Sequence, residues 1–290
     1  MSVIDTGNST CRHSKNPINL VIVTDSRGRG LDYELAFSPR ACNCVETYTK
    51  VCPGAKLSKL VEEAREIDSQ LRSRGEKADY TVIAGGICSF TRKAPLPHPG
   101  ARSLVYDTKQ DCVSEIKSEI DRVRRTLGDR VSVATIPPAS LIKYYQFMNG
   151  KPPTGAFLHA LERQQAKLLN DIENVNRYII NDNIRTRVET IDWDRKVHSH
   201  SLKKRTKGKS TFRKRVIRFT DKDLYDGVHA NTKLQDQWFT RCVEVIYKEL
   251  KKLFSSQTSS KQVEESNASD DEMPIRLQWD TTTKKYKVKD

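Results

Sequence analysis

A serine and an Asp-x-x-His pair are the residues of this chain whose types and spacing favour catalysis. An apolar run over 18–24 leads directly into Asp25-Ser26, and two glycines come soon after Ser26. Asp226 and His229 lie three residues apart, just before the last apolar helical pattern. A carboxylate in this position can orient an imidazole, and the imidazole can then take a proton from a serine hydroxyl. The three residues therefore predict nucleophilic catalysis, provided that the fold brings them together.

Each part of this pattern also has a structural alternative. A serine that ends a strand often caps the turn that follows it, without any chemical role. The pair Asp226 and Gly227 is typical of a turn, and His229 is then a half-buried histidine beside that turn. Sequence distance does not decide between these interpretations, because catalytic groups are gathered by the fold.

The elements that must position these residues alternate between strands and helices. Apolar and β-branched runs predict strands, and apolar residues at helical spacing predict helices. We expect strands at 18–24, 45–49, 79–84, 131–136 and 188–193, a short turn or helix near 31–37, and helices at 55–74, 114–127, 156–182 and 232–254. This order predicts an α/β fold, a three-layer α/β/α sandwich with a mainly parallel sheet of about five strands.

The polar residue at the end of a central parallel strand lies in the crevice where such sheets bind ligands, which places Ser26 there. Segments 90–112 and 137–156 carry no recognisable pattern, and we expect them to line the pocket as loops. The sequence does not identify the substrate or the oligomeric state.

Composition sets the expected domain organisation. We expect a disordered N-terminus over 1–16, one domain over 17–254 with a basic insertion at 195–218, and a disordered tail over 255–290. No apolar run is long enough for a transmembrane helix, and residues 1–15 lack the apolar core of a signal peptide. The sequence therefore predicts no membrane span and an intracellular protein, cytoplasmic or nuclear and not secreted.

The cysteines do not indicate a metal site. The seven cysteines are scattered, and no C-x-x-C pair is present. We expect reduced thiols, as in an intracellular protein, and neither zinc nor another cofactor.

One segment carries most of the excess positive charge. The chain has a net charge of +14, and residues 195–218 contain basic residues and no acidic ones. Mobile Lys and Arg side chains make salt-dependent contacts with phosphates, so this segment is a candidate nucleic-acid or polyanion site. A flexible solvated loop and a nuclear-import signal are the alternatives. The candidate polyanion-binding residues are Lys203, Lys204, Arg205, Lys207, Lys209, Arg213, Lys214 and Arg215.

Taken together, four short blocks resemble the SGNH hydrolases, the GDSL-type esterase and acylhydrolase superfamily. The blocks are Asp25-Ser26, Gly54, Gly86-Ile87-Cys88-Ser89 and Asp226-Gly227-Val228-His229, and the resemblance spans about residues 18–254. It implies a serine esterase in which Ser26 attacks an ester carbonyl, His229 is the general base and Asp226 orients the base. It also implies an oxyanion hole built from the N–H groups of Ser26 and Gly54 and from a side chain in the third block.

Two positions depart from the family pattern. Thr24 stands where the family has a glycine, and Cys88 stands where the family has the oxyanion-hole asparagine. A thiol is a weak hydrogen-bond donor, and losing one oxyanion donor costs roughly 10²–10³ in rate in studied hydrolases. Three interpretations follow: a slow esterase, a hole completed by another donor such as Ser89, or a degenerate enzyme that binds nucleic acid or another polyanion.

Domains of this kind also resemble those of animal and mobile-element-derived proteins. Some first-reading-frame proteins of non-LTR retrotransposons carry a similar esterase domain. This likeness rests on the Asp-Ser-Arg-Gly start at Asp25 and on the Gly-Ile-Cys block that ends at Cys88.

Overall fold

The computed structural model describes residues 17–36, 44–95, 102–108, 111–207, 210–264, 276–280 and 285–289, with the backbone alone over 199–217 and beyond 255. The chain divides into two compact units, 1–251 and 252–290. The first unit contains the sheet and every residue of the predicted serine site.

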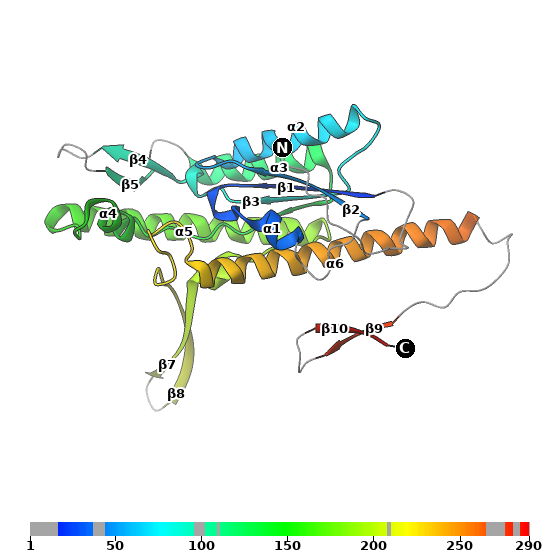
Figure 1. Ribbon diagram of the computed structural model, residues 1–290. Coiled ribbons are helices and arrows are strands. Elements are labelled where there is room, and N and C mark those ends of the chain that lie inside the picture. The colour runs from blue at the N-terminus through cyan, green and yellow to red at the C-terminus, as the bar shows by residue number, and fades with distance from the viewer. Residues whose placement is uncertain are drawn as a thin grey trace. The chain divides into compact units, whose positions relative to one another are not determined.

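The centre of the fold is a four-stranded parallel sheet in the order β2-β1-β3-β6 (Figure 1). Every residue of the central strand β1 is buried, so its apolar run faces protein on both sides. The strands are β1 (Ile18–Thr24), β2 (Val45–Val51), β3 (Tyr80–Ala84) and β6 (Val131–Val133).

Helices cover both faces of this sheet, so the fold is a three-layer α/β/α sandwich, as the sequence predicts. Helices α2 (Leu57–Arg72) and α3 (Cys112–Leu127) lie on one face, and α1 (Leu31–Ala36) and the first part of α6 (Thr232–Glu264) lie on the other (Figure 1). Helix α5 (Gly155–Arg185) packs against α3. Because side chains alternate along a strand, Val21 and Val23 share one apolar core with α2, α3 and α5.

The predicted fifth strand over 188–193 is not formed, and β6 ends at Val133 instead of residue 136. Side-chain amides of α5 occupy the backbone groups that another strand would pair with. Asn183 accepts from the N–H of Val133 at 3.4 Å and donates to its carbonyl at 2.9 Å, and Asn176 bonds both backbone groups of Ile136 in the same way. Both asparagines are buried, and the N–H of Thr135 donates to the carbonyl of Ile191 at 3.0 Å. The backbone groups at this edge are thereby satisfied, and residues 188–193 meet the edge without forming a strand.

Residues 188–193 instead anchor α6. The rings of Trp193 and Trp238 stack with centroids 5.4 Å apart, and each indole N–H donates to the other residue's carbonyl. Both side chains are fully buried. The start of α6 is thereby fixed beside the sheet, and the loop that precedes α6 carries Asp226 and His229.

Two segments without a sequence pattern are ordered elements. Strands β4 (Thr91–Pro95) and β5 (Arg102–Tyr106) form an antiparallel pair, and α4 (Leu141–Asn149) packs against β5. Helix α4 begins at Ser140, whose hydroxyl accepts from the N–H of Lys143, and ends at a left-handed Gly150. The expectation of loops is therefore wrong for these parts of 90–112 and 137–156.

The backbone of the basic segment forms an antiparallel ribbon of β7 (His198–Lys207) and β8 (Ser210–Phe219). The short helices Ser26–Gly28, Ile87–Ser89 and Asp194–Val197 complete the first unit. Over 255–290, the described backbone continues α6 to Glu264 and pairs β9 (Arg276–Asp280) with β10 (Lys285–Lys289). The predicted disorder of this tail stays a prediction. The predicted disorder of 1–16 falls outside the described residues.

The cysteines differ in part from the expectation of reduced thiols. Cys44 is disulfide-bonded, so the prediction is wrong there. Cys52, Cys88, Cys112 and Cys242 form no disulfide. In the described part of the chain, no helix combines the length and apolarity that crossing a bilayer requires.

Candidate active site

The Ser26 turn is fixed by the buried carboxylate of Asp25. One oxygen accepts from the N–H of Arg27 at 2.9 Å, and the other accepts from the N–H of Gly86 at 3.1 Å. The turn at the end of β1 is thereby tied to the end of β3. A Cβ atom on Gly85 would lie 2.6 Å from this carboxylate, so only glycine allows the close approach of the two strand ends. Ser26 therefore stands at the carboxyl edge of the sheet on a rigid turn.

A second buried carboxylate organises the loop before α6. One oxygen of Asp226 accepts from the backbone N–H groups of Val228 and His229 at 2.8 and 2.7 Å. Gly227 adopts a φ of +87°, and a Cβ there would lie 2.6 Å from the carbonyl oxygen of Ser140. The Asp-Gly turn of the sequence is thus a tight loop that presents Asp226 and His229 together.

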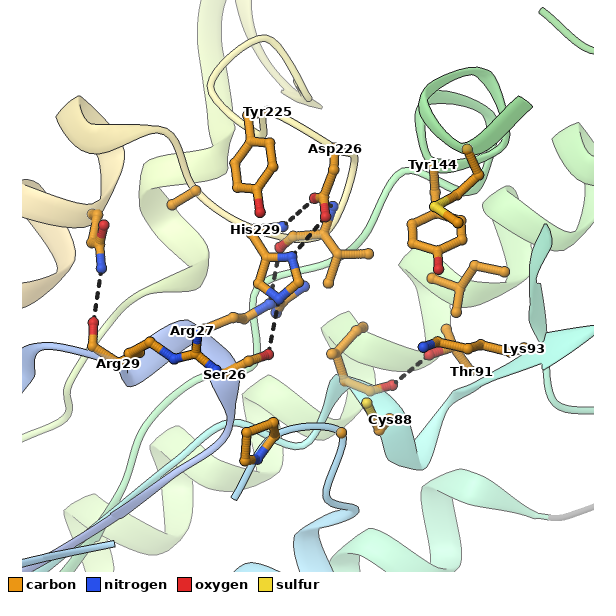
Figure 2. Close-up of a pocket in the computed structure, with 18 residues that line it drawn as sticks. Ser26, Arg27, Arg29, Cys88, Thr91, Lys93, Tyr144, Tyr225, Asp226 and His229 are labelled. Atoms are coloured by element: carbon orange, nitrogen blue, oxygen red, sulfur yellow. Dashed lines mark hydrogen bonds and ion pairs between the residues drawn. The ribbon is translucent and has the colours of Figure 1, made fainter. Parts of the chain in front are cut away.

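The structure brings Ser26, His229 and Asp226 into one chain of contacts (Figure 2). The hydroxyl oxygen of Ser26 lies 2.9 Å from His229 Nε2, and His229 Nδ1 lies 2.7 Å from Asp226 Oδ2. A carboxylate only accepts hydrogen bonds, so the proton of the neutral imidazole belongs on Nδ1. Nε2 then has a free lone pair directed at the serine hydroxyl, which is the arrangement that a general base requires.

The surroundings of Asp226 favour its charged form. Burial alone raises the pKa of this carboxyl group, but hydrogen bonds from the His229 side chain and from two backbone N–H groups outweigh burial, so its pKa lies below the ordinary value. Asp226 is therefore a carboxylate near neutral pH, and it can stabilise a protonated imidazole beside it.

Arg27 is a site residue that the sequence reasoning missed. Its side chain is 3% exposed, and its guanidinium donates to the carbonyls of Val228 (3.1 Å), Pro138 (3.4 Å) and Pro137. Burial lowers the pKa of Arg27, and the charges of Asp25 and Asp226 oppose that effect. Arg27 therefore joins the serine turn to the histidine loop. Its position directly after Ser26 was the one feature of the sequence that could have pointed to it. The sequence alone does not show that this arginine is buried.

A cavity of about 600 Å³ opens at this site, which we call the Ser26 cavity. It brings together the five residues predicted for the triad and the oxyanion hole: Ser26, Gly54, Cys88, Asp226 and His229. Its other lining residues are Arg27, Arg29, Pro53, Ile87, Thr91, Lys93, Leu104, Tyr144, Met148, Tyr225, Val228, Ala230 and Gln235. The β4–β5 pair and α4 thus supply part of the lining, as expected for the segments that contain them.

Two backbone N–H groups of the cavity lining are available to a ligand. Neither the Ser26 N–H nor the Gly54 N–H has a hydrogen-bond partner among the described residues. Gly54 has a φ of +73° and open space where a Cβ would lie. Groups of this kind stabilise an oxyanion when they converge on it.

Cys88 lies at the position expected for the third donor, and its thiol is protonated. Burial and the nearby Asp25 charge raise its pKa. Ser89, the alternative donor, does not line the cavity, and its hydroxyl oxygen accepts from the N–H of Leu57 at 2.9 Å. Only a weak donor therefore occupies the third position.

The predicted polyanion-binding residues lie elsewhere, in or beside the β7–β8 ribbon. Their backbone positions are described for all except Lys209, and the register places Lys203 opposite Lys214 and Lys204 opposite Arg213. Among the residues with described side chains, no group of three or more His, Cys, Asp or Glu is arranged to hold a metal ion.

Comparison with solved structures gives a distant likeness. No family model matches this chain, and no curated protein matches it. The crystal structure of the extracellular lipase from Streptomyces rimosus overlaps 62% of this chain and 81% of its own, with 11% sequence identity and a TM-score of 0.34. No activity follows from a likeness at this level.

The lowered pKa of Asp226 predicts how stability depends on pH. A depressed pKa in the folded state stabilises the fold above the unfolded value, which is near 3.8, and this stabilisation is lost as pH falls through the folded pKa. We expect Asp226→Asn to lower the free energy of unfolding by about 1–3 kcal/mol at pH 7, and by less at pH 3, in urea titrations. Asp236→Asn is the control, because Asp236 is exposed. A deficit of equal size at both pH values contradicts the assigned interactions.

Proposed function

We propose that this chain is a serine hydrolase of the SGNH type that cleaves a carboxylic or acetyl ester. The observation that carries the proposal is the 2.9 Å contact between Ser26 Oγ and His229 Nε2, two residues 203 positions apart in the sequence. The contact from His229 Nδ1 to Asp226 completes the order of groups that ester hydrolysis by a serine requires.

The proposed reaction proceeds in two halves. Ser26 Oγ attacks the ester carbonyl carbon while His229 Nε2 takes the hydroxyl proton, and Asp226 stabilises the imidazolium that forms. The oxygen of the tetrahedral intermediate accepts from the N–H groups of Ser26 and Gly54. Nε2 then protonates the departing alcohol oxygen, which leaves an acyl group on Ser26. A water molecule, deprotonated by the same nitrogen, attacks that acyl group. The bond from the acyl carbon to Ser26 Oγ then breaks, Nε2 returns the proton to Ser26 Oγ, and the acid is released.

Phosphonylation of the serine tests this proposal directly. We expect a fluorophosphonate probe to label the wild-type chain, because attack on phosphorus needs the same nucleophile and base. We expect Ser26→Ala to abolish labelling and His229→Ala to slow it at least tenfold, since general-base assistance contributes typically 10²–10⁴ in rate.

Ser69→Ala is the control, because Ser69 is exposed on α2 and does not line the Ser26 cavity. Absence of labelling in the wild-type chain, or equal labelling of Ser26→Ala, would remove the hydrolase proposal.

Cys88 makes the proposed enzyme slow. A protonated thiol cannot replace the two donor hydrogens of an amide. We therefore expect Cys88→Asn to raise kcat for an aryl acetate by about 10²-fold. This is the lower end of the rate effect of one oxyanion-hole donor in studied hydrolases. Cys88→Ala is the control and should give no gain. An unchanged kcat in Cys88→Asn would mean that the oxyanion does not face residue 88.

A second candidate function is binding of nucleic acid or another polyanion through the β7–β8 ribbon. The supporting observation is the register, because like charges directly opposite each other in an antiparallel pair are destabilising. Lys203 faces Lys214, and Lys204 faces Arg213, at neighbouring positions. A bound polyphosphate relieves this repulsion, and a two-stranded ribbon has the width to enter the major groove of DNA.

Salt dependence tests this second function. We expect the chain to bind a DNA duplex with an affinity that falls steeply with salt. Lys203→Gln/Lys214→Gln should reduce the slope of log K against log[salt] by roughly two, because each lost phosphate contact removes about 0.9.

Lys77→Gln/Lys233→Gln removes the same charge from two exposed positions outside the ribbon and is the control. Equal slopes in the two double variants would contradict binding through the ribbon.

A further inference from the structure

Three of the five large apolar side chains that remain exposed among the described residues lie at or beside the Ser26 cavity. The exposed ones among the described residues are Tyr33, Phe147, Met148, Ile184 and Tyr225. Met148 and Tyr225 line the cavity, and the ring of Phe147 meets that of Tyr225 edge-on with centroids 5.9 Å apart. Single exposed apolar residues are ordinary, whereas a group of them marks a surface that an apolar ligand covers. We call Phe147, Met148 and Tyr225 the apolar rim.

The apolar rim adjoins the reacting groups. The ring of Tyr225 stacks on the imidazole of His229 with centroids 5.9 Å apart, and Figure 2 shows it beside the Asp226–His229 pair. Tyr144 and Leu104, both largely buried, continue the apolar wall into the cavity. A ligand that covers the rim therefore lies against His229.

Two cations also line the cavity without a partner. Arg29 and Lys93 are exposed, and neither has an ion pair with a described residue. Figure 2 shows them on opposite sides of the Ser26–His229 contact. Lys93 lines the same cavity as Cys88, and its charge acts to lower the pKa of the Cys88 thiol, against the larger effect of burial.

The carboxylate that lines the cavity is already hydrogen-bonded and does not neutralise these two cations. Asp226 is the only carboxylate among the lining residues, and both its oxygens accept from the histidine loop. Arg92, the neighbour of Lys93 on β4, does not line the cavity and lies 3.8 Å from the carboxylate of Asp107. The two unpaired cations thus belong to the cavity, while the adjacent cation outside it is paired.

We propose that the Ser26 cavity takes esters that join an apolar or aromatic group to a group carrying a negative charge. The apolar group covers the apolar rim, and the anionic group pairs with Arg29 or Lys93. That the ligand is an ester rests on the proposed hydrolase function. The preference for an anionic, apolar ligand follows from the lining of the cavity and does not depend on catalysis.

Binding of two reaction products that are nearly equal in shape but differ in charge tests the preference without turnover. The probes are 6-hydroxy-2-naphthoate and its neutral carboxamide, 6-hydroxy-2-naphthamide, titrated against the full chain by naphthalene fluorescence. We expect the anion to bind more tightly. Arg29→Gln and Lys93→Gln should each reduce the ratio of the two affinities, anion over neutral probe, about threefold. A factor of this size corresponds to the loss of one exposed ion pair.

Arg92→Gln is the matched control, because it removes the same charge from the same strand outside the cavity. Met148→Ser should weaken both probes alike, since it removes apolar area and no charge. Equal affinity for the two probes, or a preference that moves as much in Arg92→Gln as in Lys93→Gln, would overturn the proposal. Unchanged affinity in Met148→Ser would overturn the role of the rim.

Turnover separates this inference from the proposed function. We expect the acetyl ester of 6-acetoxy-2-naphthoate to be hydrolysed with a higher kcat/KM than that of the neutral 6-acetoxy-2-naphthamide. Each kcat/KM is first divided by the rate constant for hydrolysis of the same compound by hydroxide. Fluorophosphonate labelling of Ser26 with no preference between the naphthalene probes would leave the hydrolase standing and reject the ligand class. A preference that depends on Arg29 and Lys93 without labelling would support the ligand class and reject the hydrolase.

Discussion

The imidazole of His229 is held between a carboxylate and a hydroxyl, and the rest of the site serves to keep it there. Asp226 binds Nδ1 and also the backbone N–H of the same residue, so ring and backbone are fixed by one carboxyl group. The serine hydroxyl then meets Nε2 at 2.9 Å without any change in the loop. A displacement of about 1 Å at such a contact is enough to lose most of its catalytic value.

The scaffold maintains this contact from both sides. Asp25 ties the serine turn to β3, and Arg27 ties that turn to the carbonyl of Val228 in the histidine loop. The Trp193–Trp238 pair fixes the helix that follows this loop. These interactions are buried, so each is worth more than a surface contact of the same length, and the removal of one partner leaves a buried polar group unsatisfied.

The sequence predicted the parts that follow local rules. A few neighbouring residues are enough to predict some elements. These are strand β1 from its apolar run, helices α2, α3 and α5 from their apolar spacing, and the Asp-Gly turn before His229. The fifth strand was a wrong prediction because Asn176 and Asn183 bind the backbone of Ile136 and Val133, which lie 40 and 50 residues before them. Burial of Arg27 and the pairing of β4 with β5 depend on tertiary contacts, which no periodicity reveals. The catalytic role of the triad stays a prediction.

A crystal structure of the phosphonylated chain tests the central claim most directly. The account predicts phosphorus bonded to Ser26 Oγ, with a phosphoryl oxygen within about 3 Å of the N–H groups of Ser26 and Gly54. It also predicts that His229 Nε2 remains in hydrogen-bonding distance of the adduct and that Nδ1 remains on Asp226. Phosphorus on another residue, or an adduct whose oxygen faces solvent with His229 turned away, would contradict the assignment of this cavity as an active site.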